Sequence, residues 1–347
     1  MKNLLYIFVF TGSLLLISCT NVQEQGIKKA KYTVSKEEAK LWVAANRLFK
    51  PISIPKNTDT ANKAMVKLGK MLYFEKKLSK NSNISCNSCH NVSTFGVDNN
   101  PTSTGDDGRK GGRNSPTSFN AFMHIAQFWD GRAPDVEAQA KGPILNPIEM
   151  GMPSADYVID RLSNIPVYPI LFKNAFQASA KPMTYDNLAI AIGAYERTFI
   201  TPSRFDKFLE NDFEALKTDE KKGLKLFIEI GCATCHNGVA VGGNSYRVFG
   251  EKNPYPPLTR STKIDMGVYE LTKSEADKYK FKVPSLRNVA KTYPYFHDGS
   301  VQNIEDAVQI MAKTQLDKDL SAEDTKLIVS FLQTLTGELP KDAKPTL

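Results

Sequence analysis

The sequence holds few of the residues that bind metals or form disulfides: four histidines and five cysteines among 347 residues. No run of lysine and arginine is longer than two or three residues, and no basic patch is interleaved with aromatic side chains. The net charge of +8 therefore indicates a solvated basic surface and no nucleic-acid partner. With average glycine and proline, 41% hydrophobic and 24% charged residues exclude a disordered chain.

Long hydrophobic runs are absent except at the amino terminus, where residues 4–17 are largely apolar. This run is shorter than the about 20 apolar residues of a membrane-spanning helix, and polar residues follow it. It ends in Leu-Ile-Ser-Cys at residues 16–19, which is similar to the lipobox of bacterial lipoproteins. We therefore predict a signal peptide over residues 1–18, a lipid on Cys19 and a tether over residues 19–35. A plain signal peptide that happens to contain a cysteine is the alternative.

The other four cysteines occur in two short motifs. Residues 86–90 read Cys-Asn-Ser-Cys-His, and residues 232–236 read Cys-Ala-Thr-Cys-His. This is the attachment signature of c-type haem, in which two thiols one helical turn apart reach the vinyl groups and the next imidazole faces the iron. A zinc site would need a second Cys/His pair close by, and a thioredoxin-like pair needs no histidine. The sequence predicts two covalent haems on Cys86, Cys89, Cys232 and Cys235, with His90 and His236 as iron ligands.

The chain contains an internal repeat. Residues 68–74 (Leu-Gly-Lys-Met-Leu-Tyr-Phe) echo residues 222–227 (Lys-Gly-Leu-Lys-Leu-Phe), and each segment precedes a haem motif. Both have apolar residues at helical spacing, which predicts a short helix beside each haem. The fold class we predict is therefore mainly α, with two duplicated cytochrome c-like domains and long irregular loops.

Element signals predict the domain boundaries. Residues 187–196 read as a buried helix that Thr-Pro-Ser breaks at 201–203, and a helix over 321–335 begins at the N-cap Ser321. We predict an N-terminal haem domain over 36–200, a C-terminal haem domain over 201–338, and a tail over 339–347 that packs on the N-terminal domain. Gly-, Pro- and Asn-rich residues predict site-lining loops at 91–118, 141–155 and 237–300.

The second axial position of each iron decides the function. A filled position makes an electron carrier, whereas an open one can bind peroxide. His124 and His297 lie outside the motifs, and nine methionines add further candidate ligands. The composition alone leaves these ligands open.

Several segments match one known family in order and with few gaps. The chain resembles bacterial di-haem cytochrome c peroxidases from about residue 66 to residue 315, and more distantly the di-haem enzyme that matures methylamine dehydrogenase. The matching segments are Arg-Asn-Ser-Pro-Thr at 113–117, Asn-Ala at 120–121, Gln-Phe-Trp-Asp-Gly-Arg-Ala at 127–133, Pro-Ile-Glu-Met at 147–150, Phe-Lys-Val-Pro-Ser-Leu-Arg-Asn at 281–288 and Tyr-Pro-Tyr-Phe-His-Asp-Gly at 293–299.

The resemblance implies different roles for the two haems. The haem on His90 would be the low-potential, peroxidatic one, and His236 with Met311 would hold the high-potential haem, since a thioether ligand raises the reduction potential. Met311 lies on a predicted helix, so a core methionine is the plain alternative. Met266 is the other candidate ligand in the same half.

Two further residues match catalytic positions of the family. Glu149 falls where the family has the distal carboxylate that moves protons on H₂O₂, although an ordinary solvated loop glutamate would read the same. Trp129 matches the aromatic residue between the two haems, a position suited either to electron relay or to packing.

A calcium site is also implied by the resemblance. Asn114 and the carbonyls of Thr292 and Pro294 fall where the family binds Ca²⁺ between the domains. Oxygen ligands without a charged side chain predict several bound waters. His297 is expected to have a structural role at the same interface.

The sequence departs from the family in one loop. Many members carry a Ser-x-Gly-His loop whose histidine caps the peroxidatic iron in the resting enzyme, whereas residues 103–106 here read Ser-Thr-Gly-Asp. Asp106 is a poor ligand for haem iron. We therefore predict an open first haem without reductive activation; His124 is the alternative ligand.

The family resemblance predicts a peroxidase that reduces H₂O₂ with electrons from a small c-type cytochrome or a cupredoxin, and the N-terminal segment predicts a periplasmic, lipid-anchored location. Family members are often homodimers. A non-enzymatic electron shuttle would instead have both irons six-coordinate. A protein-modifying oxidase is the third hypothesis, but that relative has a tyrosine where this chain has Met311.

Overall fold

The computed structural model describes residues 33–53 and 60–343. The predicted signal peptide, Cys19 and most of the tether lie outside the described residues. The helices are α1 (Lys36–Leu48), α2 (Thr60–Tyr73), α3 (Cys86–Cys89), α4 (Val136–Leu145), α5 (Ala155–Ser163), α6 (Val167–Ala175), α7 (Tyr185–Glu196), α8 (Arg204–Leu209), α9 (Thr218–Ile230), α10 (Tyr255–Thr259), α11 (Tyr269–Thr272), α12 (Ile304–Leu316) and α13 (Ala322–Gln333).

Sheet structure is small within the described part of the chain. Strands β1 (Tyr246–Val248) and β2 (Lys280–Lys282) pair antiparallel, with Arg247 opposite Phe281. The mainly α prediction is confirmed. Of the helices described, none is long and apolar enough to cross a membrane.

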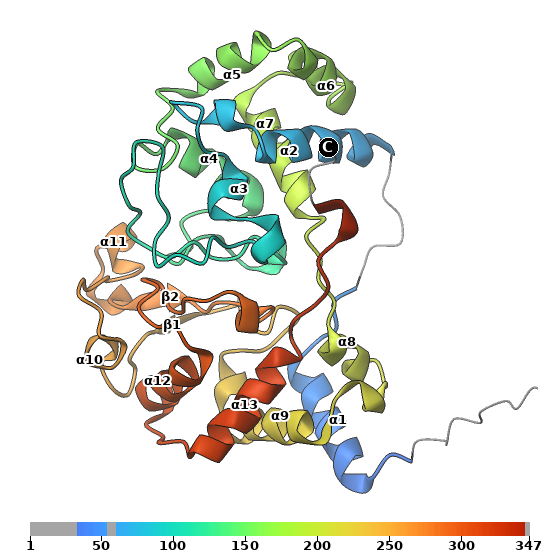
Figure 1. Ribbon diagram of the computed structural model, residues 1–347, viewed down its shortest axis with the longest axis vertical. Helices are drawn as coiled ribbons and strands as arrows, with labels where there is room; N and C mark the ends of the chain where they lie inside the picture. Colours follow the sequence, from blue (N-terminus) through green and yellow to red (C-terminus); the bar gives the residue numbers. More distant parts are fainter. Residues whose placement is uncertain (1–32, 54–59, 344–347) are drawn as a thin grey trace, which may run out of the picture. The chain divides into compact units, whose positions relative to one another are not determined.

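The first hydrophobic core forms where α2 crosses α7, with α4 and α6 beside them (Figure 1). Gly69 lies at the crossing, and a Cβ there would be 1.8 Å from the carbonyl oxygen of Ala191. Any side chain would force the two helices apart. The glycine in the first copy of the repeat is therefore a helix-crossing residue.

The second core repeats this arrangement with α9 and α13 (Figure 1). A Cβ on Gly223 would be 1.8 Å from the carbonyl oxygen of Leu327. Gly223 occupies the same place in the second copy of the repeat as Gly69 does in the first. The repeat in the sequence thus corresponds to a helix crossing that occurs in both modules.

The duplication extends into the loops that follow each haem motif. Asn120 and Asn288 both have a left-handed backbone, with φ of 60° and 62°. The amide of Asn120 donates to Phe199 O and its side chain accepts from Thr201 N; Asn288 makes the same two bonds to Leu335 O and Gly337 N. The side-chain amides of both asparagines donate to the Thr201 hydroxyl. This single threonine thus joins the two modules.

The chain ends pack across the boundary predicted from sequence. Ala45 and Phe49, at the end of α1, are buried in the second core, although residues 36–200 were predicted as the N-terminal domain. Ala343 is buried in the first core, and its carbonyl accepts a hydrogen bond from Tyr195. Each core therefore contains a segment from the far end of the chain.

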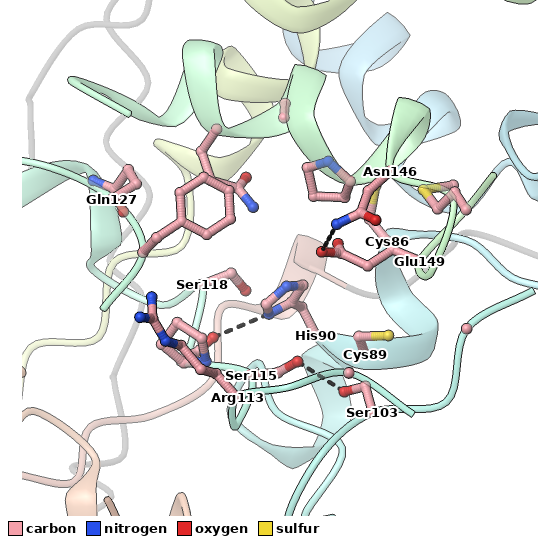
Figure 2. Close-up of a pocket in the computed structure, with 18 of the residues that line it drawn as sticks. Cys86, Cys89, His90, Ser103, Arg113, Ser115, Ser118, Gln127, Asn146 and Glu149 are labelled. Atoms are coloured by element: carbon pink, nitrogen blue, oxygen red, sulfur yellow. Dashed lines mark hydrogen bonds between the residues drawn. The ribbon is translucent and has the colours of Figure 1, made fainter. Parts of the chain in front are cut away.

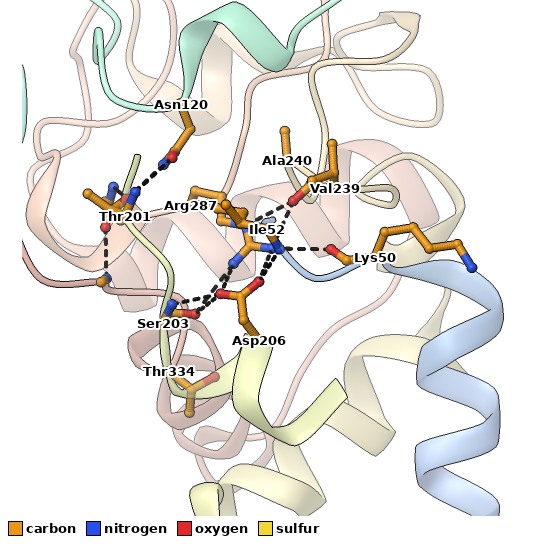
Figure 3. Close-up of polar contacts among 12 residues, drawn as sticks. Lys50, Ile52, Asn120, Thr201, Ser203, Asp206, Val239, Ala240, Arg287 and Thr334 are labelled. Carbon is orange, nitrogen blue, oxygen red and sulfur yellow. Dashed lines mark hydrogen bonds and ion pairs between the residues drawn. The ribbon is translucent and has the colours of Figure 1, made fainter. Parts of the chain in front are cut away.

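A buried ion pair fixes the α1 end to the second module (Figure 3). The guanidinium of Arg287 donates two bonds to the Asp206 carboxylate, at 2.6 and 2.8 Å, and further bonds to the carbonyls of Val239 and Lys50. Asp206 also accepts from the amide of Ile52. Because the Arg287 side chain is fully buried, this network satisfies a charge that would otherwise be costly.

The loop predictions hold for residues 91–118 but fail in part for 141–155. Helix α4 continues to Leu145 and includes Pro143. Val136, Ala140 and Ile144 are buried at four-residue spacing, so one apolar face carries the helix through the proline. Residues 237–300 contain only short helices and the two strands. Ser321 caps α13 by accepting from Asp324 N, as predicted, but the helix ends at Gln333.

Candidate functional site

The first haem motif lines a cavity of about 370 Å³ in the first module (Figure 2). Cys86 and Cys89 lie on the short helix α3, and His90 ends it. His90 Nδ1 is 3.0 Å from the carbonyl oxygen of Pro116. This contact makes Nδ1 the protonated nitrogen and leaves Nε2 as the ligand atom. Burial lowers the pKa of His90, which favours the neutral, metal-binding form.

Glu149 lines the same cavity as His90 (Figure 2). Its Oε1 accepts a hydrogen bond of 2.8 Å from the side-chain amide of Asn146. Burial raises the pKa of Glu149, and the nearby Arg132 opposes the rise. The structure therefore places the predicted residue Glu149 in the cavity of the first haem motif and adds a contact that was not predicted, the one from Asn146.

The loop at residues 103–106 is fixed against the Glu149 segment. The Asp106 amide donates to Glu149 O at 2.7 Å, and a Cβ on Gly105 would be 1.8 Å from the carbonyl oxygen of Ile148. The Asp106 carboxylate accepts three hydrogen bonds from Asn81, two from its amide and one from its side chain. Asp106 is absent from the lining of the cavity, although Gly105 contributes to it.

Three further residues line the first cavity that were not predicted to belong to a site: Gln139, Pro143 and Glu196. Glu196 is almost fully buried at the end of α7, and burial raises its pKa to about 8. Gln139 and Pro143 lie one turn apart on the same face of α4. Residues 141–145 of this helix were predicted as a loop. A helical projection of 136–145 would have grouped them.

The second haem motif lines a more apolar cavity of about 250 Å³. Cys232, Cys235, His236 and Met311 all contribute to its wall, with Met311 on α12. His236 Nδ1 is buried near the Pro284 carbonyl but outside hydrogen-bond geometry. Burial lowers the pKa of His236 to about 4, so its ring is neutral. Met266 is not part of this wall.

Both cavities fit a covalently attached haem. Each holds two free cysteines one helical turn apart and an imidazole whose pKa is lowered by burial; the first cavity has a mixed polar and apolar wall, and the second is mainly apolar. The duplicated loops place a proline carbonyl near each imidazole, Pro116 at His90 and Pro284 at His236. The cysteines and the imidazole are therefore present twice, but only His90 has its carbonyl contact in hydrogen-bond geometry.

Trp129 lines both cavities. Its indole N–H donates to Asn114 O at 2.9 Å, and its ring meets His297 edge-on, with ring centroids 6.3 Å apart. The backbone bonds here are reciprocal: Asn114 N donates to His297 O, and Lys282 N donates to Trp129 O. Trp129 and His297 are equivalent residues of the duplicated loops, so the two modules meet through matching segments.

The residues predicted to bind calcium lie at the edge of the second cavity. Asn114, Thr292 and Pro294 all contribute to its lining. The side-chain amide of Asn114 donates to Asn100 O at 3.0 Å. In the described part of the chain, no cluster of three or more His, Cys, Asp or Glu suited to a metal is found.

His124 lies in the second cavity and not in the first. The ring is buried beside Gly243, where a Cβ would be 2.4 Å from Cδ2. It is therefore placed away from the first iron, for which the sequence analysis considered it as a ligand.

Comparison with known proteins identifies the family. Residues 63–214 match the family described as di-haem cytochrome c peroxidase. Cytochrome c551 peroxidase of Pseudomonas aeruginosa is 46% identical over 310 residues, covering 87% of this chain and 88% of the relative. The chain belongs to the di-haem cytochrome c peroxidase family. Membership implies two c-type haems, in agreement with the two cavities.

Two further similarities bear on the predicted relatives. Methylamine utilization protein MauG of Methylorubrum extorquens is 32% identical over 84% of this chain and 84% of the relative, so the more distant likeness is confirmed. A solved structure of a MauG-like protein associated with microbial copper homeostasis superposes with a TM-score of 0.72 at 26% identity, covering 85% of this chain and 95% of that one. The prediction of a peroxidase-family enzyme is confirmed by these relatives.

Proposed function

We propose that this di-haem peroxidase reduces H₂O₂ to two waters, taking two electrons one at a time from a small c-type cytochrome or a cupredoxin. The observation that carries the proposal is the first cavity, where Glu149 and His90 face one space and Trp129 connects it to the second cavity. The two protons that the reaction consumes come ultimately from solvent.

Haem bound at His90 would supply the iron redox chemistry, and the chain supplies proton transfer. Glu149 takes a proton from one oxygen of H₂O₂ and returns it to the other, which leaves as water. The Asn146 amide occupies one oxygen of the carboxylate and so orients the other toward the cavity. Pro116 holds His90 with Nε2 free for the iron.

The second cavity is the electron store in this proposal. His236 and Met311 line it and would hold the second iron, with the thioether favouring a high potential. Trp129 lies between this site and the first, in contact with both cavities. Its indole is fixed by Asn114, which keeps the ring in one orientation for electron relay.

The first site would be open in the resting enzyme, because the 103–106 loop has no histidine and Asp106 is absent from the cavity lining. Asp106 is held by Asn81, its backbone amide donates to Glu149 O, and the guanidinium of the nearby Arg109 donates to Pro147 O. Each of these contacts would have to break before the loop could swing inward. We therefore expect peroxide binding without prior reduction of the second haem.

Calcium binding belongs to the same proposal. Asn114, Thr292 and Pro294 all line the second cavity, and the Asn114 carbonyl accepts a hydrogen bond from Trp129. Ca²⁺ at these oxygens would stabilise the meeting point of the two modules. We also propose a periplasmic location with a lipid on Cys19, which rests on the N-terminal sequence and on c-type haem attachment.

The test uses fully oxidised holoenzyme that has never been reduced. Electron paramagnetic resonance of the resting protein should give a high-spin signal for one haem, and cyanide should convert it to low spin. H₂O₂ should be consumed when a reduced small cytochrome is added. Glu149→Gln should lower turnover by roughly 10²- to 10⁴-fold, because general acid–base catalysis is lost.

Glu229→Gln is the matched control, because Glu229 is an exposed glutamate of α9. It should turn over at the wild-type rate. A resting low-spin bis-histidine signal would contradict the open site. Two haems that both resist cyanide would identify an electron shuttle instead of a peroxidase.

A further inference from the structure

Lys282 is a buried lysine without an anionic partner among the described residues. It lies in β2, is 6% exposed, and lines the second cavity. Burial lowers the pKa of its ammonium group to about 8. By contrast, the buried Arg287 pairs with Asp206, and the half-buried Arg113 pairs with Asp130 and Asp265. A buried charge costs free energy unless it is paired. The ammonium group of Lys282 therefore favours an anion beside it in the cavity.

His124 presents a second unsatisfied group to the same cavity. Its Nε2 is buried and has no hydrogen-bond partner in the described structure. Burial and the positive charge of Lys282 lower the pKa of His124 to about 3, so the ring is neutral. A neutral imidazole has one N–H donor, so the lysine and the histidine together offer donors and a positive charge.

The backbone brings these two residues together from different modules. Ile125 N donates to Gly243 O, and Gly243 N donates to Val283 O, which places the His124 segment beside the strand that carries Lys282. Gly243 has φ of 73° and no Cβ, which leaves room for the His124 ring. Backbone hydrogen bonds between the two modules thus bring Lys282 and His124 to the same cavity.

We propose that Lys282 and His124 form the receptor for one propionate carboxylate of the haem attached at Cys232 and Cys235. Both residues line that cavity and neither lines the first one. A carboxylate accepts hydrogen bonds from an ammonium and an imidazole N–H at once, which satisfies both buried groups. Lys282 is thereby a positioning residue of the second haem.

The receptor also tunes the second haem and links it to Trp129. A positive charge beside a haem stabilises the reduced iron, which carries one charge less, and so raises the reduction potential. The Lys282 amide donates to Trp129 O at 2.8 Å. One residue therefore holds both the propionate and the backbone of the aromatic ring between the cavities.

The experiment is potentiometry of the holoenzyme, with both haems resolved, on wild type, Lys282→Met and Lys282→Arg. The Met side chain fills the space without charge. In Lys282→Met the potential of the second haem should fall while that of the first stays unchanged, and Lys282→Arg should recover most of the loss. The resonance Raman propionate bending band of the second haem should shift in Lys282→Met.

Lys280→Met is the matched control, since Lys280 lies in the same strand but pairs with Asp277. It should leave both potentials and the Raman band at wild-type values. If Lys282→Met loses haem, His124→Leu gives the same Raman test with the lysine intact. Unchanged potential and band in these variants would overturn the proposal. The proposal concerns the second haem only. The predicted changes in potential and Raman band could therefore occur in a protein without peroxidase activity.

Discussion

At the scale of single residues, the two acids of the first cavity have different environments. Glu149 has a hydrogen-bond donor in Asn146 and a nearby cation in Arg132. Glu196 is buried on the α7 side near Cys86 and Tyr73, and its nearest charged neighbours are Glu137 and Arg197. Glu149 is thus suited to proton exchange, whereas Glu196 is held in the neutral form.

Glu196 should make stability depend on pH. Burial raises its folded-state pKa to about 8, while in the unfolded chain it is about 4.3. Between these two values the unfolded state has lost the proton and the folded state keeps it, so the free energy of unfolding falls as pH rises. Glu196→Gln should therefore raise the apparent Tm at pH 8, on the order of a few degrees, and change it little at pH 4.5.

Thermal unfolding followed by circular dichroism at the two pH values checks this. The exposed Glu229→Gln variant should not alter the pH dependence. An equal gain from Glu196→Gln at both pH values would mean that ionisation of this carboxyl is not coupled to folding.

At the scale of elements, the repeated unit is a pair of crossing helices. Gly69 and Gly223 each face a carbonyl oxygen of the partner helix, at Ala191 and Leu327. Tyr195 and Phe331 follow one turn later on those partner helices and pack beside the same glycines. A haem motif follows each crossing in the chain, at Cys86 after α2 and at Cys232 after α9.

Alanine at either crossing should be destabilising. Gly223→Ala should lower the free energy of unfolding by about 1–3 kcal/mol, because the Leu327 carbonyl cannot move without shifting α13. Gly69→Ala should have a similar effect in the first module. Denaturant unfolding of the holo-protein measures this. Gly142→Ala is the control, since a Cβ there meets only Phe128, at 3.6 Å, and stability should be unchanged or higher.

At the scale of the whole molecule, the duplicated loops bring the two sites together. The Trp129 and His297 loops contact each other, and each is bonded by backbone to the equivalent segment of the other module. The bidentate pair between Arg113 and Asp265 also joins the modules, at 2.6 and 2.9 Å. The proposed electron transfer between the haems would therefore cross an interface of the two copies.

Trp129→Phe should slow electron transfer between the haems while leaving haem content and cyanide binding unchanged. The smaller ring cannot donate to Asn114 O, so its orientation is no longer fixed. Stopped-flow absorbance of half-reduced enzyme mixed with H₂O₂ measures the step. Trp42→Phe is the control, because that indole bonds to Leu209 O on the α1 side. Equal rates in all three proteins would leave Trp129 a packing residue only.

Local chemistry is what the sequence by itself determined about this protein. Two Cys-x-x-Cys-His motifs predict two haems because attachment needs only neighbouring residues, and the helical spacing of the repeat predicts the helices that cross at Gly69 and Gly223. The mainly α fold and the family followed from these short patterns. The absence of the loop histidine was also readable, because Asp106 occupies its place in an otherwise matching segment.

Only the tertiary structure decided which distant residues meet. That Asn81 binds Asp106 and that Trp129 lines both cavities depend on loops without periodicity, whose paths follow from packing. The juxtaposition of Lys282 with His124 joins residues of two modules, and no local pattern records it. Burial gives such contacts their energetic effect, because an unpaired charge or donor costs free energy only where water is excluded.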